Sequence, residues 1–166
     1  SVENADTTAP TVTSFTASTS SVDVSSGGQV VAFTLTASDL SGVNWRNSYI
    51  ALTHSSGVSP LTKYSYGWSP DVSVSADGNS MTFYVPFLPD DAVGDYTVSY
   101  ISVVDRLGNS ADLTSGNELT ITLSGGSSVE NADTTAPTVT SFTASTSSVD
   151  VSSGGQVVAF TLTASD

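Results

Sequence analysis

Four oxygen-bearing side chains, Asp6, Asp39, Asp105 and Asn109, could act together although they lie far apart in the sequence. Carboxylate and amide oxygens are the ligands that Ca²⁺ prefers, and Ca²⁺ takes about six to eight of them at roughly 2.3–2.6 Å. Mg²⁺ fits such a set less well, because it demands octahedral geometry and keeps its waters. The four residues therefore predict a calcium site, provided that the fold brings them together. Each one alone is also an ordinary loop residue, since Asp and Asn favour turns for local hydrogen-bonding reasons.

The charge balance points to cations as partners. The 166 residues include 16 Asp and Glu but only 3 Lys and Arg, which gives a formal net charge of −13. A chain with this charge repels phosphate backbones and anionic lipid surfaces. No apolar run approaches the length of a transmembrane helix. We therefore expect neither nucleic acid nor direct membrane insertion.

The sequence offers no set of residues suited to catalysis. It contains no Cys, which excludes disulfides, thiol chemistry and Cys-based zinc sites. The single His, His54, has no nucleophile placed beside it by any motif. The neighbours Asp90 and Asp91 would point apart in an extended chain, so they do not form the carboxylate pair of a glycosidase. We therefore expect that the protein is not an enzyme.

A long internal repeat organises the chain. Residues 1–39 and residues 128–166 are identical, at an offset of 127 residues. An identity of this length reflects either a natural tandem array or a segment duplicated by design, and recent duplication within an array is the interpretation we favour. Residues 1–127 then form one complete repeat, with a flexible Ser/Gly-rich linker at 124–130, and residues 128–166 hold the first third of the next one, its first two strands. The sequence is thus expected to be a piece of a longer protein.

Short segments of alternating hydrophobicity predict an all-β fold. In residues 29–38, Val31, Phe33, Leu35 and Ala37 alternate with smaller or polar residues, which is typical of a half-buried strand. The expected strands lie at 11–18, 22–24, 29–38, 44–54, 61–66, 71–76, 80–87, 95–104 and 112–123. Their number and spacing predict an immunoglobulin-like Greek-key β-sandwich. Tyr96 stands just where such folds carry a tyrosine corner.

This topology makes a prediction about the carboxylates. In a sandwich the chain start and the loops after 29–38 and 95–104 meet at one pole, which would gather Asp6, Asp39, Asp105 and Asn109. The opposite pole faces the next repeat. There, a second site bridging two repeats would draw on acidic residues of the 88–94 loop, the linker and the second copy: Asp90, Asp91, Glu130, Asp133 and Asp166.

The repeat also creates a choice of partners for the middle of the chain. Residues 40–123 have two identical candidates for their missing strands, the first copy and the second. We expect the first copy to win because residues 39 and 40 are directly joined, and strand swapping through the second copy is a hazard. The second copy would otherwise expose strand edges and an apolar face. It is expected to be disordered, packed on the first domain or paired with another molecule.

Three short motifs carry a resemblance to a known family. The order DTTAP (6–10), ASDLSGV (37–43) and VVDRLGN (103–109) resembles the immunoglobulin-like extender repeats of large bacterial RTX surface adhesins. The resemblance implies a secreted, cell-surface protein with many near-identical repeats. It implies spacer repeats that contact neighbouring identical repeats, project a distal ligand-binding region from the cell and are rigidified by Ca²⁺ at their junctions. By matching motif it assigns calcium ligation to Asp6, Asp39, Asp105, Asn109 and Asp133.

An aromatic cluster offers an alternative function. Tyr64, Tyr66 and Trp68 are spaced by two, so they would line one face of a strand. On an exposed face they could bind a glycan or a protein. The interpretation that we favour here is that they belong to the core or cover a sheet edge, because near-identical copies suit length better than recognition.

Overall fold

The computed structural model describes residues 6–58, 61–116, 118–131 and 135–165. The chain divides into two compact units, residues 1–133 and residues 134–166. The calcium ligands expected at Asp133 and Asp166 lie outside the described residues.

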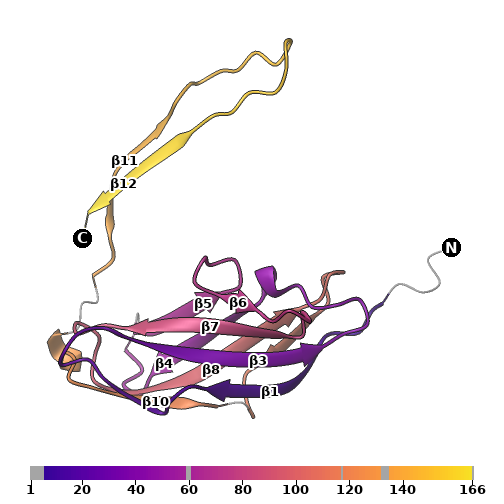
Figure 1. Ribbon diagram of the computed structural model, residues 1–166. Helices are drawn as coiled ribbons and strands as arrows, with labels where there is room; N and C mark the ends of the chain where they lie inside the picture. The colour runs from indigo at the N-terminus through magenta and orange to yellow at the C-terminus, as the bar shows by residue number, and fades with distance from the viewer. Residues whose placement is uncertain (1–5, 59–60, 117, 132–134, 166) are drawn as a thin grey trace. The chain divides into compact units, whose positions relative to one another are not determined.

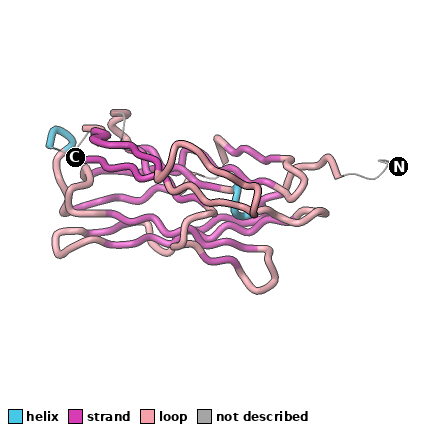
Figure 2. Tube along the Cα trace, turned by 90° about the horizontal axis from the view of Figure 1, so that it is seen from above, coloured by secondary structure: helices cyan, strands magenta, loops and turns pink. Residues whose placement is uncertain are grey.

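Unit 1 is built almost entirely from strands. Its strands are β1 (Thr11–Ala17), β2 (Ser21–Asp23), β3 (Gln29–Ser38), β4 (Tyr49–His54), β5 (Thr62–Tyr66), β6 (Ser73–Val74), β7 (Ser80–Phe87), β8 (Gly94–Val104), β9 (Ser110–Leu113) and β10 (Thr120–Ser124). Two short 3-10 helices, η1 (Trp45–Asn47) and η2 (Val129–Asn131), complete its regular elements. Figure 2 shows the strands running along the unit, with the loops gathered towards its ends.

The strands form two sheets that face each other (Figure 1). One sheet has the order β1-β3-β7-β6, and the other has the order β2-β10-β8-β4-β5, with β9 also paired to β8. All pairings are antiparallel except β2 with β10, which is parallel. The chain therefore switches sheets between β1 and β2. This arrangement is the predicted immunoglobulin-like Greek-key sandwich.

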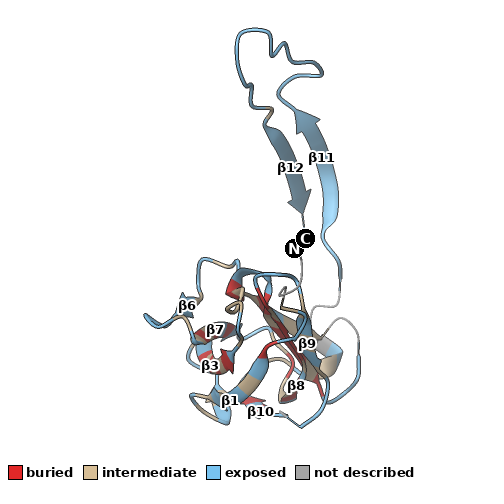
Figure 3. Cartoon of the chain, turned by 90° about the vertical axis from the view of Figure 1, so that its right-hand side faces the viewer, coloured by how far each residue is buried: buried red, intermediate tan, exposed pale blue. Residues whose placement is uncertain are grey.

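Alternation along the strands places the core between the two sheets. In β3, Val31, Phe33, Leu35 and Ala37 are buried while Thr34 and Thr36 are only partly covered, as the pattern predicted. The facing sheet contributes Ile101, Val103 and Ile121, among others. Figure 3 shows these buried residues as an inner layer of unit 1. An aligned sandwich buries the inner face of each sheet in this way.

Two predicted strands differ from the structure. The strand expected at 44–54 begins only at Tyr49, because η1 turns Trp45 inward, where its indole Nε1 donates to the carbonyl oxygen of Gly78 at 2.7 Å. The strand expected at 112–123 is two strands, β9 and β10. Gly116 interrupts it with a φ of 83°, and the two pieces pair with opposite ends of β8.

The tyrosine corner is confirmed. The hydroxyl of Tyr96 donates to the carbonyl oxygen of Ala92 at 3.0 Å, and the ring is 1 % exposed. The Phe87 ring meets the Tyr96 ring edge-on at 5.3 Å between centroids. Tyr96 thereby fastens the start of β8 to the loop before it.

Unit 2 is a β-hairpin of β11 (Thr138–Ala144) and β12 (Phe160–Ser165). Its register repeats that of β1 and β3, including the irregularity between Val139 and Ser141 that matches the one between Val12 and Ser14. Disorder was one of three alternatives that the sequence left open for the second copy, and in the structure residues 138–144 and 160–165 form paired strands. Every residue of both strands is exposed, whereas the same sequence in unit 1 lines a core (Figure 3).

Candidate metal centre

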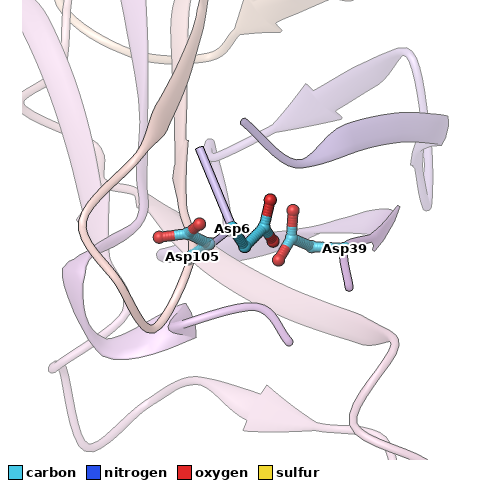
Figure 4. Close-up of side chains that lie close together, drawn as sticks. All are labelled: Asp6, Asp39 and Asp105. Carbon is cyan, nitrogen blue, oxygen red and sulfur yellow. The ribbon is translucent and has the colours of Figure 1, made fainter. Parts of the chain in front are cut away.

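Three carboxylates from distant segments converge at one pole of unit 1. Asp6 precedes β1, Asp39 follows β3 and Asp105 follows β8, and each offers an oxygen within 4.8 Å of the others (Figure 4). The topology explains the convergence, because β1 pairs antiparallel with β3 so that Thr11 lies opposite Ser38. A bridge between Val43 and Asp105 brings the two loops together.

Hydrogen bonds fasten the N-terminal segment to this pole. Asn109 donates through Nδ2 to the backbone oxygen of Asp6 at 3.1 Å and to Oδ2 of Asp105 at 2.6 Å. The backbone N–H of Ser41 donates to Oδ2 of Asp6 at 3.2 Å and to Oδ1 of Asp39 at 2.9 Å. Asn109 therefore presents its amide NH₂ to the cluster, and a half-turn of the amide would present its oxygen instead. Ser41 was missed by sequence reasoning, although its position two residues after Asp39 is typical of an Asx turn.

The environment lowers the pKa of two of these carboxylates, Asp105 and Asp6. Asp105 is fully buried, and desolvation is the largest single influence and raises its pKa. Hydrogen bonds from Asn109, Leu107 and Gly108 together outweigh it, so the pKa of Asp105 is lowered from its ordinary value. Hydrogen bonds from Thr8 lower the pKa of Asp6. A carboxylate that accepts several such bonds is stabilised in its charged form.

Among the residues that the structure describes, no basic side chain forms an ion pair with these carboxylates. The one ion pair found there joins Lys63 and Asp91, at 2.7 Å. Arg106 lies in the same loop as Asp105, but its guanidinium group packs beside Gly42. Three like charges this close repel one another, and a bound cation would relieve the repulsion. The atoms that these three side chains offer to a metal are all carboxylate oxygens, which suit Ca²⁺ and not a softer metal.

The opposite pole is organised differently. Oδ2 of Asp91 accepts from Lys63 and from the backbone N–H of Leu88, so this oxygen is already engaged. The linker docks beside it: Ser127 donates to the Asp91 carbonyl at 2.9 Å and accepts from Val93 N–H at 2.7 Å. Asp90 is exposed in this loop, and Glu130 is exposed in η2. Within the described ranges, Asp90, Asp91 and Glu130 do not form a group with convergent oxygens.

His54 has a structural setting. Its ring is 3 % exposed, Nδ1 accepts from Ser56 N–H at 3.1 Å, and Nε2 lies 3.0 Å from the carbonyl oxygen of Val93. Since Nδ1 accepts, Nε2 carries the proton and donates to Val93. The ring also meets Tyr96 edge-on. His54 thus links the end of β4 to the loop before β8.

The aromatic cluster is on the surface and not in the core. Tyr64 is 52 % exposed and Trp68 is 62 % exposed, and β5 is the edge strand of its sheet. The rings of Tyr64, Tyr66 and Trp68 are nearly parallel, with successive centroids 5.8 and 5.3 Å apart. Tyr49 continues the stack across to Tyr100. At these separations each ring covers part of the next ring's face.

Comparison with known proteins identifies no family. No family model matches the chain, and no curated protein matches it. Among solved structures, CopC from Methylosinus trichosporium OB3b aligns at 20% identity over 69% of this chain and 93% of its own, with a TM-score of 0.38. AggA, the major subunit of aggregative adherence fimbriae type I from Escherichia coli, aligns at 14% identity over 74% of this chain and 100% of its own, with a TM-score of 0.39. Likenesses at this level say nothing about function. Among the described residues, no helix is long and apolar enough to cross a membrane.

Proposed function

We propose that unit 1 is a calcium-rigidified spacer repeat of a secreted bacterial cell-surface adhesin, an extender that holds a distal ligand-binding region away from the cell. The observation that carries the proposal is the approach of Asp6, Asp39 and Asp105 to within 4.8 Å. The exact repetition of residues 1–39 at 128–166 supports it, because near-identical copies multiply length without adding a new recognition surface.

The position of Asp6 explains how an ion would stiffen an array. Asp6 belongs to the segment that leads into β1, whereas Asp39 and Asp105 belong to loops of the sandwich itself. Asn109 and Ser41 already hold this segment against the sandwich. A bound Ca²⁺ would supply the positive charge that ties all three carboxylates together. The lead-in segment would then move with the sandwich, and the joint to a preceding repeat would lose freedom.

The fold suits a spacer in its dimensions. The strand β8 has 11 residues, which corresponds to about 36 Å at roughly 3.3 Å per residue. The two poles therefore lie far apart, with the lead-in segment at one of them and the linker that follows β10 at the other. Repeats joined in this way add length with each copy.

Thermal unfolding in excess EDTA, in millimolar Ca²⁺ and in millimolar Mg²⁺ tests this proposal. A ligand that binds only the folded state stabilises it by RT ln(1 + [L]/Kd). We expect Ca²⁺ to raise the midpoint and Mg²⁺ to raise it much less. Equal midpoints in EDTA and Ca²⁺ would leave a sandwich without a calcium function.

The exposed aromatic stack supports a second candidate, a glycan- or protein-binding module. Trp68 is its most exposed ring, at 62 %. Screening the chain against a glycan array, with Trp68→Ala as the control, distinguishes the two candidates. Binding that the variant loses would favour recognition over spacing.

A further inference from the structure

The chain enters and leaves the sandwich of unit 1 at opposite poles. The lead-in segment reaches β1 beside the end of β3, since Thr11 lies opposite Ser38. The chain leaves through β10, whose end lies beside the start of β8, since Leu123 lies opposite Gly94. Figure 1 shows the lead-in to β1 and the segment after β10 at opposite ends of the unit. A pull on these two points therefore acts along the strands.

Both terminal strands point along the direction of such a pull. The strand β1 starts at the pole of the three carboxylates, so a pull on its start draws it lengthwise past β3. The strand β10 ends at the opposite pole, so a pull on its end draws it lengthwise past β8. Hydrogen bonds between strands run across the strand direction. A lengthwise pull therefore stretches all the bonds of a pair together, in shear, whereas a pull across the strands opens the pairs one after another.

Among the described residues, β2 and β10 are the one pair of parallel strands. The backbone N–H of Thr122 donates to the carbonyl oxygen of Ser20 at 2.9 Å. The N–H of Val24 donates to the carbonyl oxygen of Ser124 at 3.0 Å, and the Ser124 hydroxyl donates to the Val22 carbonyl at 3.2 Å. Because the two strands are parallel, pulling the entry and the exit apart draws β2 and β10 in opposite directions along one axis. All these bonds are then loaded at once.

Buried side chains of this pair add to its resistance. Val24 is fully buried and Leu123 is 2 % exposed, and Val22 packs against the same core. Drawing β2 past β10 would bring this apolar surface into contact with water, which costs free energy in proportion to its area. The hydrogen bonds and the core contacts of the pair must therefore yield together.

The linker is fastened beyond the end of β10 and does not hang free. Ser127 pairs in parallel with Ala92, its N–H donates to the Asp91 carbonyl at 2.9 Å, and its carbonyl accepts from Val93 at 2.7 Å. This approach requires glycine at the preceding position, because a Cβ at Gly126 would lie 2.5 Å from the Asp91 carbonyl oxygen. A pull that leaves through the linker thus meets the 88–94 loop first, and the tyrosine corner fastens that loop to β8.

We propose that unit 1 is built to resist end-to-end tension, and that residues 20–24 paired with residues 122–124 form a terminal clamp that must break before the unit unfolds under force. Because this rests on the proposed function, the tension is the force that reaches a spacer when the distal region of the adhesin holds its ligand. The terminal clamp includes none of the three carboxylates of the metal centre. It is therefore tested in EDTA, where the absence of a calcium function would not alter the result.

Single-molecule force spectroscopy of the full chain in EDTA measures this resistance. The chain has no Cys, so two introduced cysteines define the points of attachment. Thr7→Cys with Glu130→Cys, both at exposed positions, pulls unit 1 end to end. Thr7→Cys with Ala76→Cys is the matched control, because the turn before β7 lies at the same pole as Thr7 and on the other side of the sheet β1-β3-β7-β6. That pull acts across the strands.

The direction of the pull should decide the unfolding force. Forced unfolding follows the rate of unfolding, so both pairs are compared at one loading rate. We expect the end-to-end pull to need at least about twice the force of the pull across the strands, because several hydrogen bonds break together. Equal forces in the two directions would overturn the proposal.

Val24→Pro tests the terminal clamp itself. The substitution removes the N–H that donates to Ser124, and urea unfolding with near-UV circular dichroism shows whether the variant is folded. We expect a lower force for the end-to-end pull and an unchanged force for the pull across the strands. Equal loss in both directions would mean that only overall stability has fallen, and no loss in either would mean that the force is borne elsewhere; each result would overturn the assignment of the clamp. The comparison of the two directions with Val24 in place does not depend on the folding of this variant.

Discussion

Asn109 and Asp6 are separated by 103 residues, yet the Asn109 side chain donates to the Asp6 backbone oxygen at 3.1 Å. The same amide donates to Asp105, so one side chain holds two of the three acidic segments together. Part of the site is therefore held together by hydrogen bonds of the protein itself. Preorganisation of this kind lowers the cost of binding a ligand.

Asp39→Asn separates a metal ligand from a turn residue. The amide oxygen still accepts from Ser41, so the turn is kept while one of three neighbouring charges is removed. In EDTA we expect a midpoint of unfolding equal to or above that of the native chain, because repulsion falls. In Ca²⁺ we expect roughly tenfold weaker binding, equivalent to about 1.4 kcal/mol.

The control for this comparison is Asp77→Asn, since Asp77 caps an exposed turn through Ser75 and Asn79 and lies outside the cluster. Calorimetric titration with Ca²⁺ measures the affinity of all three proteins. An Asp39→Asn variant that keeps native affinity would remove Asp39 from the ligand set.

Asn109→Ala tests the fastening of the lead-in segment. The variant loses two hydrogen bonds, one of them to a buried carboxylate that is left with fewer donors. We expect a loss of about 1–3 kcal/mol in the free energy of unfolding, measured by urea titration in EDTA. Asn79→Ala, in an exposed turn, should cost less than about 1 kcal/mol. Equal costs for the two variants would show that the contact does not stabilise the fold.

The limits of sequence reasoning follow from particular residues. Most strands were predictable from alternating hydrophobicity, as at Val31, Phe33 and Leu35, and from turn residues between them. The topology of a sandwich then predicted that Asp6, Asp39 and Asp105 lie at one pole. The sequence places Trp45 in the strand expected at 44–54, and the residue is buried but lies in η1. Its indole donates to the carbonyl oxygen of Gly78, a distant contact that spacing does not reveal. The docking of Ser127 on Asp91 depends on tertiary contacts that spacing does not encode.

Alkaline unfolding tests the burial of the Tyr96 hydroxyl. Desolvation by burial, followed by the nearby charge of Asp91, raises the pKa of Tyr96 to about 12. Because its pKa in the unfolded chain is about 10, the folded state holds this proton more tightly. The resulting stability is complete below about pH 10 and is lost as the pH rises towards 12.

Desolvation and Asp112 likewise raise the pKa of Tyr100 to about 12, so both tyrosines contribute to this loss. We therefore expect Tyr96→Phe to cost about 0.5–1.5 kcal/mol at pH 7 and to weaken the pH dependence between 10 and 12. Tyr84→Phe, at a tyrosine that is 38 % exposed, serves as the control. An unchanged pH dependence in Tyr96→Phe would contradict the raised pKa of Tyr96.

The repeat supplies an internal control for the core itself. Phe33 and Phe160 share the same sequence neighbours, but Phe33 is fully buried and Phe160 is 64 % exposed. Phe33→Ala should therefore cost about 3–5 kcal/mol through lost burial and the cavity left behind. Phe160→Ala should change the unfolding of unit 1 by no more than about 0.5 kcal/mol. Both Trp residues, Trp45 and Trp68, lie in unit 1, so urea unfolding followed by tryptophan fluorescence reads this unit alone.

The urea unfolding of both variants is measured at low protein concentration, so that association between chains does not contribute. A large loss in Phe160→Ala would mean that the hairpin already packs on another part of the native chain. A small loss in Phe33→Ala would mean that β3 is not the strand that fills the core. We expect the phenylalanine side chain to stabilise the fold at position 33 and to contribute almost nothing at position 160. Because intrinsic propensity and local sequence are identical at the two positions, this contrast isolates burial as the cause.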